Sequence, residues 1–182
     1  MTLTETGFEG LIVLEPRIFE DQRGFFMESY NQKTLAGLGI NKVFVQDNHS
    51  KSSKGVIRGL HFQNRPYEQT KLVRTLKGRI LDVVVDIRKN SATFGKHFSI
   101  EISEENKKQL LIPPGFAHGF TALTDDAQIL YKCDQFYHAE SEGGLLYNDP
   151  ELNIDWKIDL AQAIVSEKDK VHPGIKDLDS TF

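Results

Sequence analysis

Three side chains in this sequence have the chemistry needed to invert a carbon atom: His61, Lys71 and Tyr131. The imidazole of His61 changes protonation near neutral pH, which makes it a candidate general base. An ammonium group on Lys71 that faces a cavity could stabilise an oxyanion, such as an enolate formed next to a ketone. The phenol of Tyr131 could return a proton from the other side. A base and an acid on opposite faces of one carbon would invert it.

Each of these residues also has a purely structural interpretation. His61 could be hydrogen-bonded inside a barrel, Lys71 could face solvent, and Tyr131 could be a core residue with a satisfied hydroxyl. A base also needs an acceptor that orients its second ring nitrogen. Asp169 is a candidate for that acceptor, although an acid at the start of a helix is commonly solvated.

The faces of the strands decide which side chains meet. Alternation along a strand places Arg58 opposite His61, unless a bulge at Gly59 realigns the two. The same alternation places Tyr131 and Cys133 on one face of their strand.

The spacing around His61 resembles the metal-binding pattern of cupin jelly rolls, with two ligands replaced. That pattern reads Gly, five residues, His-x-His, a short gap, Glu, six residues, Gly. Gly55 is followed after five residues by His61, but Gln63 stands at the second His. Lys71 stands where Glu is expected, six residues before Gly78. An ammonium group repels a divalent cation, so the sequence predicts a site without a metal.

A second cupin pattern, Pro-x-Gly-x-x-His, runs from Pro113 to His118. Without its usual partners, we expect His118 to be a hydrogen-bonding residue that contacts substrate. The other histidines lack partners at informative spacing, and we interpret them as surface or structural residues: His49, His97, His138 and His172.

Short apolar or alternating runs, separated by turn residues, predict an all-β fold. These runs cover residues 10–14, 25–30, 42–48, 55–63, 71–76, 79–87, 97–102, 110–112, 120–123 and 127–136. Lys77-Gly78 predicts a hairpin between two of them. Helical signals cover 32–38, 103–107 and the C-terminal tail, where Asp159 or Ser166 could cap short helices and Ser166 with Asp169 resembles a capping box. We therefore predict a double-sheet jelly roll with short helices at its C-terminal end.

Composition limits the class of protein. The length suits one domain over residues 1–182, and a net charge of −4 argues against a nucleic-acid partner. The single cysteine, Cys133, excludes an internal disulfide and suits a reducing cytosol. The chain has no apolar leader-like segment and no run that approaches a membrane span, which favours a soluble cytoplasmic protein.

Taken together, the segments resemble the dTDP-4-dehydrorhamnose 3,5-epimerase family of sugar-nucleotide enzymes. The resemblance runs from about Phe8 to Pro173. Its most specific motifs are the segments 21–26, 46–48, 58–63, 111–120, 131–133, 140–144 and 166–169.

The resemblance implies a homodimeric, metal-free cupin that needs no cofactor. It would invert C3 and C5 of dTDP-4-dehydro-6-deoxy-D-glucose to give dTDP-4-dehydro-L-rhamnose, in dTDP-L-rhamnose biosynthesis. His61 would accept the proton, oriented by Asp169, Tyr131 would donate one, and Lys71 would stabilise the enolate oxygen at C4. The implied substrate-binding residues are Arg23, Glu28, Gln46, Asp47, Asn48, Arg58, Lys71, His118, Glu142 and Lys168, and Phe19 and Phe26 could surround thymine.

Three other functions stay open from the sequence. A metal-dependent cupin could use His61, Gln63 and His118, although Lys71 is no metal ligand. A non-catalytic module could bind the sugar nucleotide without exchanging its protons. A family member could also invert only C3 or only C5, because the same base and acid serve both carbons.

Overall fold

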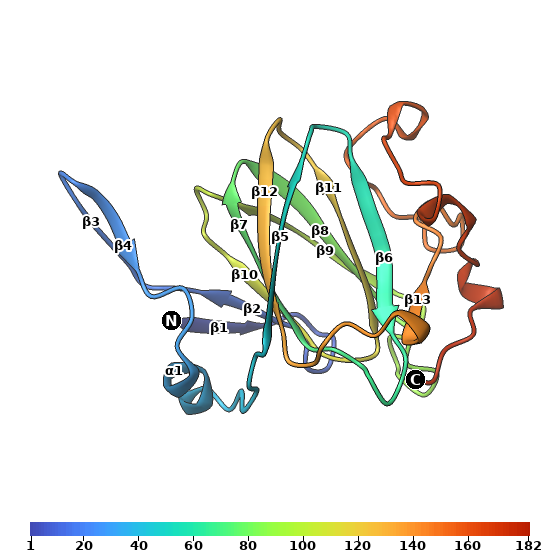
Figure 1. Ribbon diagram of the computed structural model, residues 1–182, viewed down its shortest axis with the longest axis horizontal. Coiled ribbons are helices and arrows are strands. Elements are labelled where there is room, and N and C mark those ends of the chain that lie inside the picture. The colour runs from blue at the N-terminus through green and yellow to red at the C-terminus, as the bar shows by residue number, and fades with distance from the viewer.

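The computed structural model describes residues 1–182, and two antiparallel β-sheets packed face to face form its centre (Figure 1). The six-stranded sheet has the spatial order β1 (Thr2–Glu5), β2 (Ile12–Glu15), β10 (Gln109–Ile112), β7 (Lys71–Lys77), β12 (Ala127–Cys133), β5 (Gln46–Ser52). The five-stranded sheet has the order β13 (Glu142–Gly144), β6 (Ile57–Gln63), β11 (Phe116–Ala122), β8 (Arg79–Asp86), β9 (His97–Ser103). This architecture confirms the predicted double-sheet jelly roll.

The strands β1, β3 and β13 were not predicted from the sequence. β1 is an edge strand with no fully buried residue, so it lacks the apolar alternation that marks a half-buried strand. The strand β3 (Ile18–Asp21) pairs only with β4 (Gly24–Met27) and is largely exposed. β13 has three residues, two of them glycine, which is too short for a periodic signal.

The hairpin predicted at Lys77-Gly78 is wrong. β7 lies in the six-stranded sheet and β8 in the five-stranded sheet, so the turn carries the chain from one layer to the other. Gly78 has a φ of +71°, and its N–H donates to Oε1 of Glu104 at 2.7 Å. Turn residues indicate that the chain changes direction, but they do not indicate which strand pairs with the strand that follows the turn.

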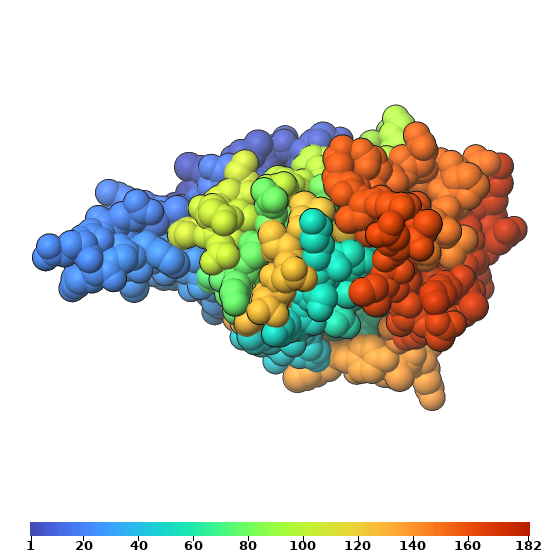
Figure 2. Space-filling model, turned by 90° about the horizontal axis from the view of Figure 1, so that it is seen from above, coloured from blue at the N-terminus to red at the C-terminus, as the bar shows by residue number.

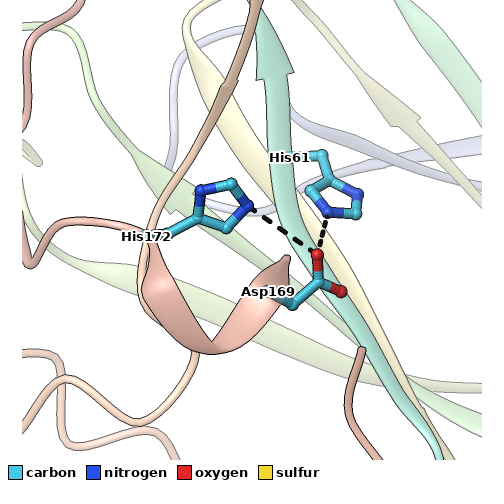
Figure 3. A group of neighbouring side chains, drawn as sticks. All are labelled: His61, Asp169 and His172. Carbon is cyan, nitrogen blue, oxygen red and sulfur yellow. Dashed lines mark hydrogen bonds and ion pairs between the residues drawn. The ribbon is translucent and has the colours of Figure 1, made fainter. Parts of the chain in front are cut away.

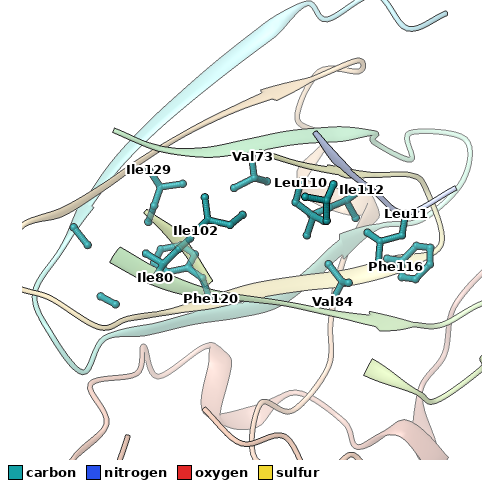
Figure 4. Packing of buried hydrophobic residues seen from close by; sticks show 13 residues of the cluster. Leu11, Val73, Ile80, Val84, Ile102, Leu110, Ile112, Phe116, Phe120 and Ile129 are labelled. Carbon is teal, nitrogen blue, oxygen red and sulfur yellow. The ribbon is translucent and has the colours of Figure 1, made fainter. Parts of the chain in front are cut away.

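The principal core lies between the two sheets (Figure 4). Its side chains come from both layers, among them Val73, Leu110 and Ile129 from one and Val84 and Phe120 from the other. Their burial supplies the hydrophobic free energy that holds the sheets together.

A second core lies on the outer face of the five-stranded sheet, where the segment after β13 covers it. Val83 and Val85 of β8 pack there against Leu152 and Trp156, while Val84 faces the principal core. β8 is therefore buried on both faces, which explains its nearly continuous apolar sequence.

Helical structure is short throughout. The helix predicted over 32–38 is confirmed as α1 (Gln32–Gly37), which Asn31 caps by accepting the N–H groups of Lys33 and Thr34. The helix predicted over 103–107 is wrong: these residues form one turn around the Ser103 hydroxyl. Four 3₁₀ turns complete the set: η1 (Ala139–Ser141), η2 (Leu160–Gln162), η3 (Asp169–Val171) and η4 (Ile175–Asp177).

The predicted caps of the tail are partly confirmed. Asp159 caps η2 by accepting the N–H of Ala161 at 3.0 Å. Ser166 Oγ accepts the N–H of Asp169 at 3.2 Å, which is one half of a capping box. The carboxylate of Asp169 bonds to β6 instead of completing the box.

The β3–β4 pair forms an arm that extends away from the sheets, at the end opposite the C-terminal segment (Figures 1 and 2). The arm carries three largely exposed phenylalanines, Phe19, Phe25 and Phe26. None of the helices has the length and apolar character that crossing a lipid bilayer requires.

Candidate active site

A cavity of about 690 Å³ opens between the sheets. Strands β5, β6, β7, β11 and β12 contribute side chains to its wall, and the segment 164–169 closes one side. Among the lining residues are Asn48, Arg58, His61, Lys71, His118, Tyr131, Lys168 and Asp169. A smaller pocket shares four of these residues, Asn48, His61, Lys71 and Tyr131, and adds Gln46 and Glu142.

His61 and Asp169 form the centre of this cavity. Nε2 of His61 lies 2.7 Å from Oδ1 of Asp169 (Figure 3). The N–H of Gly59 donates to Oδ2 of Asp169 at 3.1 Å. Burial alone would raise the pKa of the Asp169 carboxyl, but these hydrogen bonds outweigh it and hold the pKa below its usual value. An ionised carboxylate only accepts, so Nε2 carries the proton and Nδ1 holds the free lone pair. Asp169 is thus hydrogen-bonded to the ring of His61, in the position of the acceptor that a base would need.

A bulge in β6 places Arg58 and His61 in the same cavity. The pairing of β6 with β11 shifts register between His118 and Phe120, opposite this point, so the alternation that would separate the two side chains is broken. Gly59 makes the bulge possible. Its φ is +111°, and a Cβ there would lie 2.6 Å from Cα of Gly119.

Lys71 points into the cavity, as the cupin register predicts. Burial lowers the pKa of its ammonium group, and the charges of Cys133, Asp82 and Glu142 partly oppose that effect. Cys133 is the Cα partner of Lys71 across β12 and β7. The half-buried Lys71 has no salt-bridge partner of its own, so its side chain is available to an anionic group of a ligand.

Tyr131 shares this cavity and faces it from β12. Burial raises the pKa of the phenol, and the charge of Cys133 adds to the rise. The phenol therefore stays protonated at neutral pH and can donate a proton. Cys133 lies on the same face of β12, where Nδ2 of Asn48 approaches its Sγ at 3.7 Å, so the predicted alternation is confirmed.

Two other cupin ligand positions, Gln63 and His118, form hydrogen bonds within the protein. His118 is buried, and its Nε2 donates to Oδ1 of Asp82 at 2.6 Å. The Gln63 amide donates to the carbonyls of Tyr67 and Phe136, and its oxygen accepts the N–H of His138. Because its donors and acceptor are all used, Gln63 serves the loop structure and is not free to bind a metal.

One group of side chains has the donor types and spacing of a metal site: His61, Asp169 and His172, whose ligand atoms lie within 4.8 Å of one another. The 2.7 Å contact between His61 and Asp169 is a hydrogen bond, however, and it needs a proton between the two atoms.

Most of the predicted binding residues meet at the cavity. Arg58 and Lys168 line it, and Lys168 forms an ion pair with Glu142. Gln46 and Asn48 face the smaller pocket from β5 and hydrogen-bond to each other at 3.1 Å.

Three predicted binding residues lie outside this cavity. Asp47 points to the other face of β5, where it pairs with Lys132 at 2.9 Å. Arg23 lies on the β3–β4 arm with its side chain 86% exposed, and Glu28 accepts hydrogen bonds from Asn31 and Thr34 at the start of α1. Side chains alternate along β5, so Asp47 points away from the cavity that Gln46 and Asn48 face. Arg23 lies far from the cavity of its own chain because it is part of the extended arm.

Comparison with known proteins identifies the family. The model of the family described as dTDP-4-dehydrorhamnose 3,5-epimerase matches residues 5–177. The chain belongs to the dTDP-4-dehydrorhamnose 3,5-epimerase family. An enzyme of that name from Shigella flexneri is 50% identical over 93% of both chains, and one from Pseudomonas aeruginosa is 47% identical over 98% of both.

Solved structures of this epimerase family superpose closely. A dTDP-4-dehydrorhamnose 3,5-epimerase from Elizabethkingia anophelis is 53% identical, with a TM-score of 0.92 over 97% of both chains. A dTDP-6-deoxy-D-glucose-3,5-epimerase from Legionella pneumophila, in complex with dTDP-4-keto-L-rhamnose, is 46% identical, with a TM-score of 0.93 over 98% of this chain and 94% of that one.

Within this epimerase-family fold, sequence reasoning overlooked His172. His172, interpreted from the sequence as a surface or structural residue, lies against both His61 and Asp169 (Figure 3). Its position three residues after Asp169 was the available signal, since the 3₁₀ turn η3 brings residues at this spacing to one side. His138 is structural as expected: it stacks on Tyr67 with ring centroids 3.8 Å apart.

Proposed function

We propose that this protein inverts both C3 and C5 of dTDP-4-dehydro-6-deoxy-D-glucose to give dTDP-4-dehydro-L-rhamnose, in dTDP-L-rhamnose biosynthesis. The observation that carries the proposal is the His61–Asp169 pair, which shares one cavity with the half-buried Lys71 and the protonated Tyr131. The similarity to enzymes named for this reaction supports it.

The reaction is a proton exchange next to a ketone, carried out twice. Nδ1 of His61 removes the proton from one carbon beside the C4 carbonyl, and the electron pair moves to the C4 oxygen as an enolate. Lys71 stabilises that oxygen with its ammonium group. Tyr131 then donates a proton to the opposite face of the carbon and is reprotonated from solvent, while His61 releases its proton to solvent. The second carbon reacts in the same way.

Acid–base catalysis alone gives too small a rate acceleration for an enzyme, so it must combine with other effects. General acid–base catalysis contributes about 10²–10⁴-fold, and one preorganised charge or donor contributes about 10²–10³-fold. His61 and Tyr131 supply the first effect and Lys71 the second. No step requires an electron acceptor, because each carbon keeps its oxidation state.

We further propose that two copies of the chain form a homodimer in which the arm of each copy reaches the cavity of the other. The binding residues that the family resemblance implies, Arg23 and Glu28, lie away from their own cavity. Phe19 and Phe26 on the same arm are exposed apolar surface that a partner would cover. A guanidinium on such an arm suits a pyrophosphate, because it bonds to phosphate oxygens in pairs.

Mixing two inactive variants tests the shared site. His61→Ala lacks the base and Arg23→Ala lacks the arm cation, so each homodimer should be nearly inactive. In a mixed dimer one cavity combines an intact His61 with an intact Arg23. Random mixing of subunits should therefore restore about a quarter of the active sites. Mixtures that stay inactive, although mixed dimers are detected by native mass spectrometry, would show that the arm does not complete the partner's site.

A family member that inverts a single carbon is the principal alternative. A 3'-monoepimerase from Streptomyces bikiniensis is 31% identical to this chain, with a TM-score of 0.88. Enzymes named as 3,5-epimerases reach 50–53% identity, which favours inversion of both carbons. Incubating the 4-keto sugar nucleotide in heavy water, read by NMR, separates the possibilities. Deuterium at both carbons supports the proposal, deuterium at one carbon indicates a monoepimerase, and none indicates a binding module.

The proposed location is the cytoplasm. Cys133, the single cysteine, is buried and free, which suits a reducing compartment.

A further inference from the structure

His172 contacts the same carboxylate oxygen that orients the proposed base. Its Nε2 lies 3.7 Å from Oδ1 of Asp169, the atom that accepts from His61 at 2.7 Å. The rings of His61 and His172 meet edge to face, with centroids 5.8 Å apart and planes at 80° (Figure 3). Nε2 of His172 is buried and has no hydrogen-bond partner, although buried polar atoms are nearly always paired.

The fold reserves space for this ring. Gly144 of β13 is the Cα partner of His61, and a Cβ at Gly144 would lie 2.3 Å from ring atoms of His172. Any side chain at that position would therefore displace the ring. A ring packed this closely against β13 limits how far the neighbouring ring of His61 can turn.

The charges around His172 decide when it can carry a proton. The groups that face it are His61 on β6, Glu142 on β13, and Lys168 with Asp169 in the turn that leads into η3. Burial and then the positive charge of His61 lower the pKa of His172, against the attraction of Asp169. His172 is consequently neutral near neutral pH. Oδ1 of Asp169 then accepts a hydrogen bond from His61 alone.

We propose that His172 is a positioning residue for His61. As a neutral ring it packs against His61 and keeps Nε2 of His61 on Asp169. When His172 gains a proton at acid pH, its Nε2–H draws Oδ1 of Asp169 away from His61. The new positive charge also disfavours the imidazolium that His61 becomes when it takes the substrate proton, so proton removal stops. The inference rests on the proposed function, in which His61 is the base.

An NMR titration of the ring nitrogens tests the coupling in the free protein, without substrate. The signals of His61 should move in two steps, and the second should coincide with the protonation of His172, because the two groups titrate as a pair. His172→Phe keeps an aromatic ring in contact with His61 but has no nitrogen, so His61 should then titrate in one step. His97→Phe, on β9, is the matched control and should keep both steps. A single step in the unmodified protein, or two steps in His172→Phe, would overturn the proposal.

Turnover separates the packing role from the charge role. His172→Ala should lower kcat about tenfold with KM unchanged, less than the roughly hundredfold loss that a 1 Å misplacement can cause. His172→Phe should restore kcat to within about threefold near neutral pH but shift the acid limb of the pH profile. An unshifted acid limb in His172→Phe would refute the charge role, and an unchanged kcat in His172→Ala would refute the packing role. If coupled titration is seen while His61→Ala retains turnover, the proposed base fails and the coupling stands.

Discussion

Replacing Asp169 by Asn tests the orientation of the base most directly. The 2.7 Å hydrogen bond between Nε2 of His61 and the carboxylate is charge-assisted once His61 holds the substrate proton. Hydrogen bonds to charged groups contribute about 1.5–3 kcal/mol. At about 1.4 kcal/mol for each factor of ten, the loss of charge should slow proton removal by roughly 10–100-fold. If the amide presents its NH₂ group to Nε2, the ring adopts the other tautomer, and the loss should reach about 10⁴-fold.

The pH dependence of this variant carries a second test. The pKa of Asp169 is held below its usual value, so the carboxylate is ionised throughout the working range and adds no acid limb of its own to the activity. A lowered folded-state pKa contributes stability above the unfolded value of about 3.9, and this stability is lost as the pH falls through the folded value. Asp169→Asn should therefore be less stable than the unmodified protein at pH 7, and the difference should shrink below about pH 4.

Deuterium incorporation at C3 and C5, followed by NMR over a range of pH, measures the effect on catalysis. The affinity for dTDP, measured by calorimetry, should change little. Asp169 bonds to His61 and does not position a cation that would bind the pyrophosphate. Asp159→Asn is the matched control, since an Asn oxygen can still cap η2. Exchange at the unmodified rate in Asp169→Asn, at both carbons and at every pH, would refute the orienting role.

Three further outcomes follow from the site and its bulge. Tyr131→Phe should reduce inverted product more than loss of substrate hydrogen in heavy water, and equal reductions would remove Tyr131 as the donor. Activity should survive dialysis against a chelator, with elemental analysis used to verify that no metal remains. A loss of activity that added zinc or iron restores would favour a metal-dependent cupin. Gly59→Ala should destabilise the fold by about 2–4 kcal/mol in urea unfolding, because of its positive φ and the 2.6 Å approach to Gly119. Gly37→Ala in α1, where a Cβ meets nothing, should be neutral or stabilising and serves as its control.

Most strands and the residues that meet at the cavity could be predicted because each leaves a short-range pattern. β8 reads as an apolar run since both of its faces are covered, and the motif around His61 fixes which side chains enter the barrel. Arg58 faces the cavity only because β6 has a bulge, and the sequence alone did not decide whether that bulge forms. Its occurrence follows from Gly59 and Gly119, whose backbones approach across β6 and β11.

Features that depend on distant partners could not be predicted. The turn at Lys77-Gly78 looks like a hairpin, but the pairing of β7 with β10 and β12 is set by packing between layers. The pairing of His118 with Asp82 joins residues 36 positions apart, and no local pattern connects them. His172 meets the ring of His61 only when the C-terminal segment folds back on β6, and residues near His172 in the sequence do not indicate that contact.

The replacement of a metal ligand by Lys71 changes which charge the barrel can hold. His61 and His118 keep the paired positions on β6 and β11 that a cupin metal would use, but each donates to its own carboxylate. The cavity therefore contains two histidines that are each hydrogen-bonded to a carboxylate and one lysine, Lys71, that has no salt-bridge partner. Two unit charges 4 Å apart at an effective dielectric of about 20 interact by about 4 kcal/mol. That energy corresponds to a rate factor on the order of 10³, which an ammonium group delivers only while the C4 oxygen is negative. In the proposed mechanism, a cation at Lys71 with no strong partner in the resting protein stabilises the enolate more than the ketone, and this difference would accelerate the exchange.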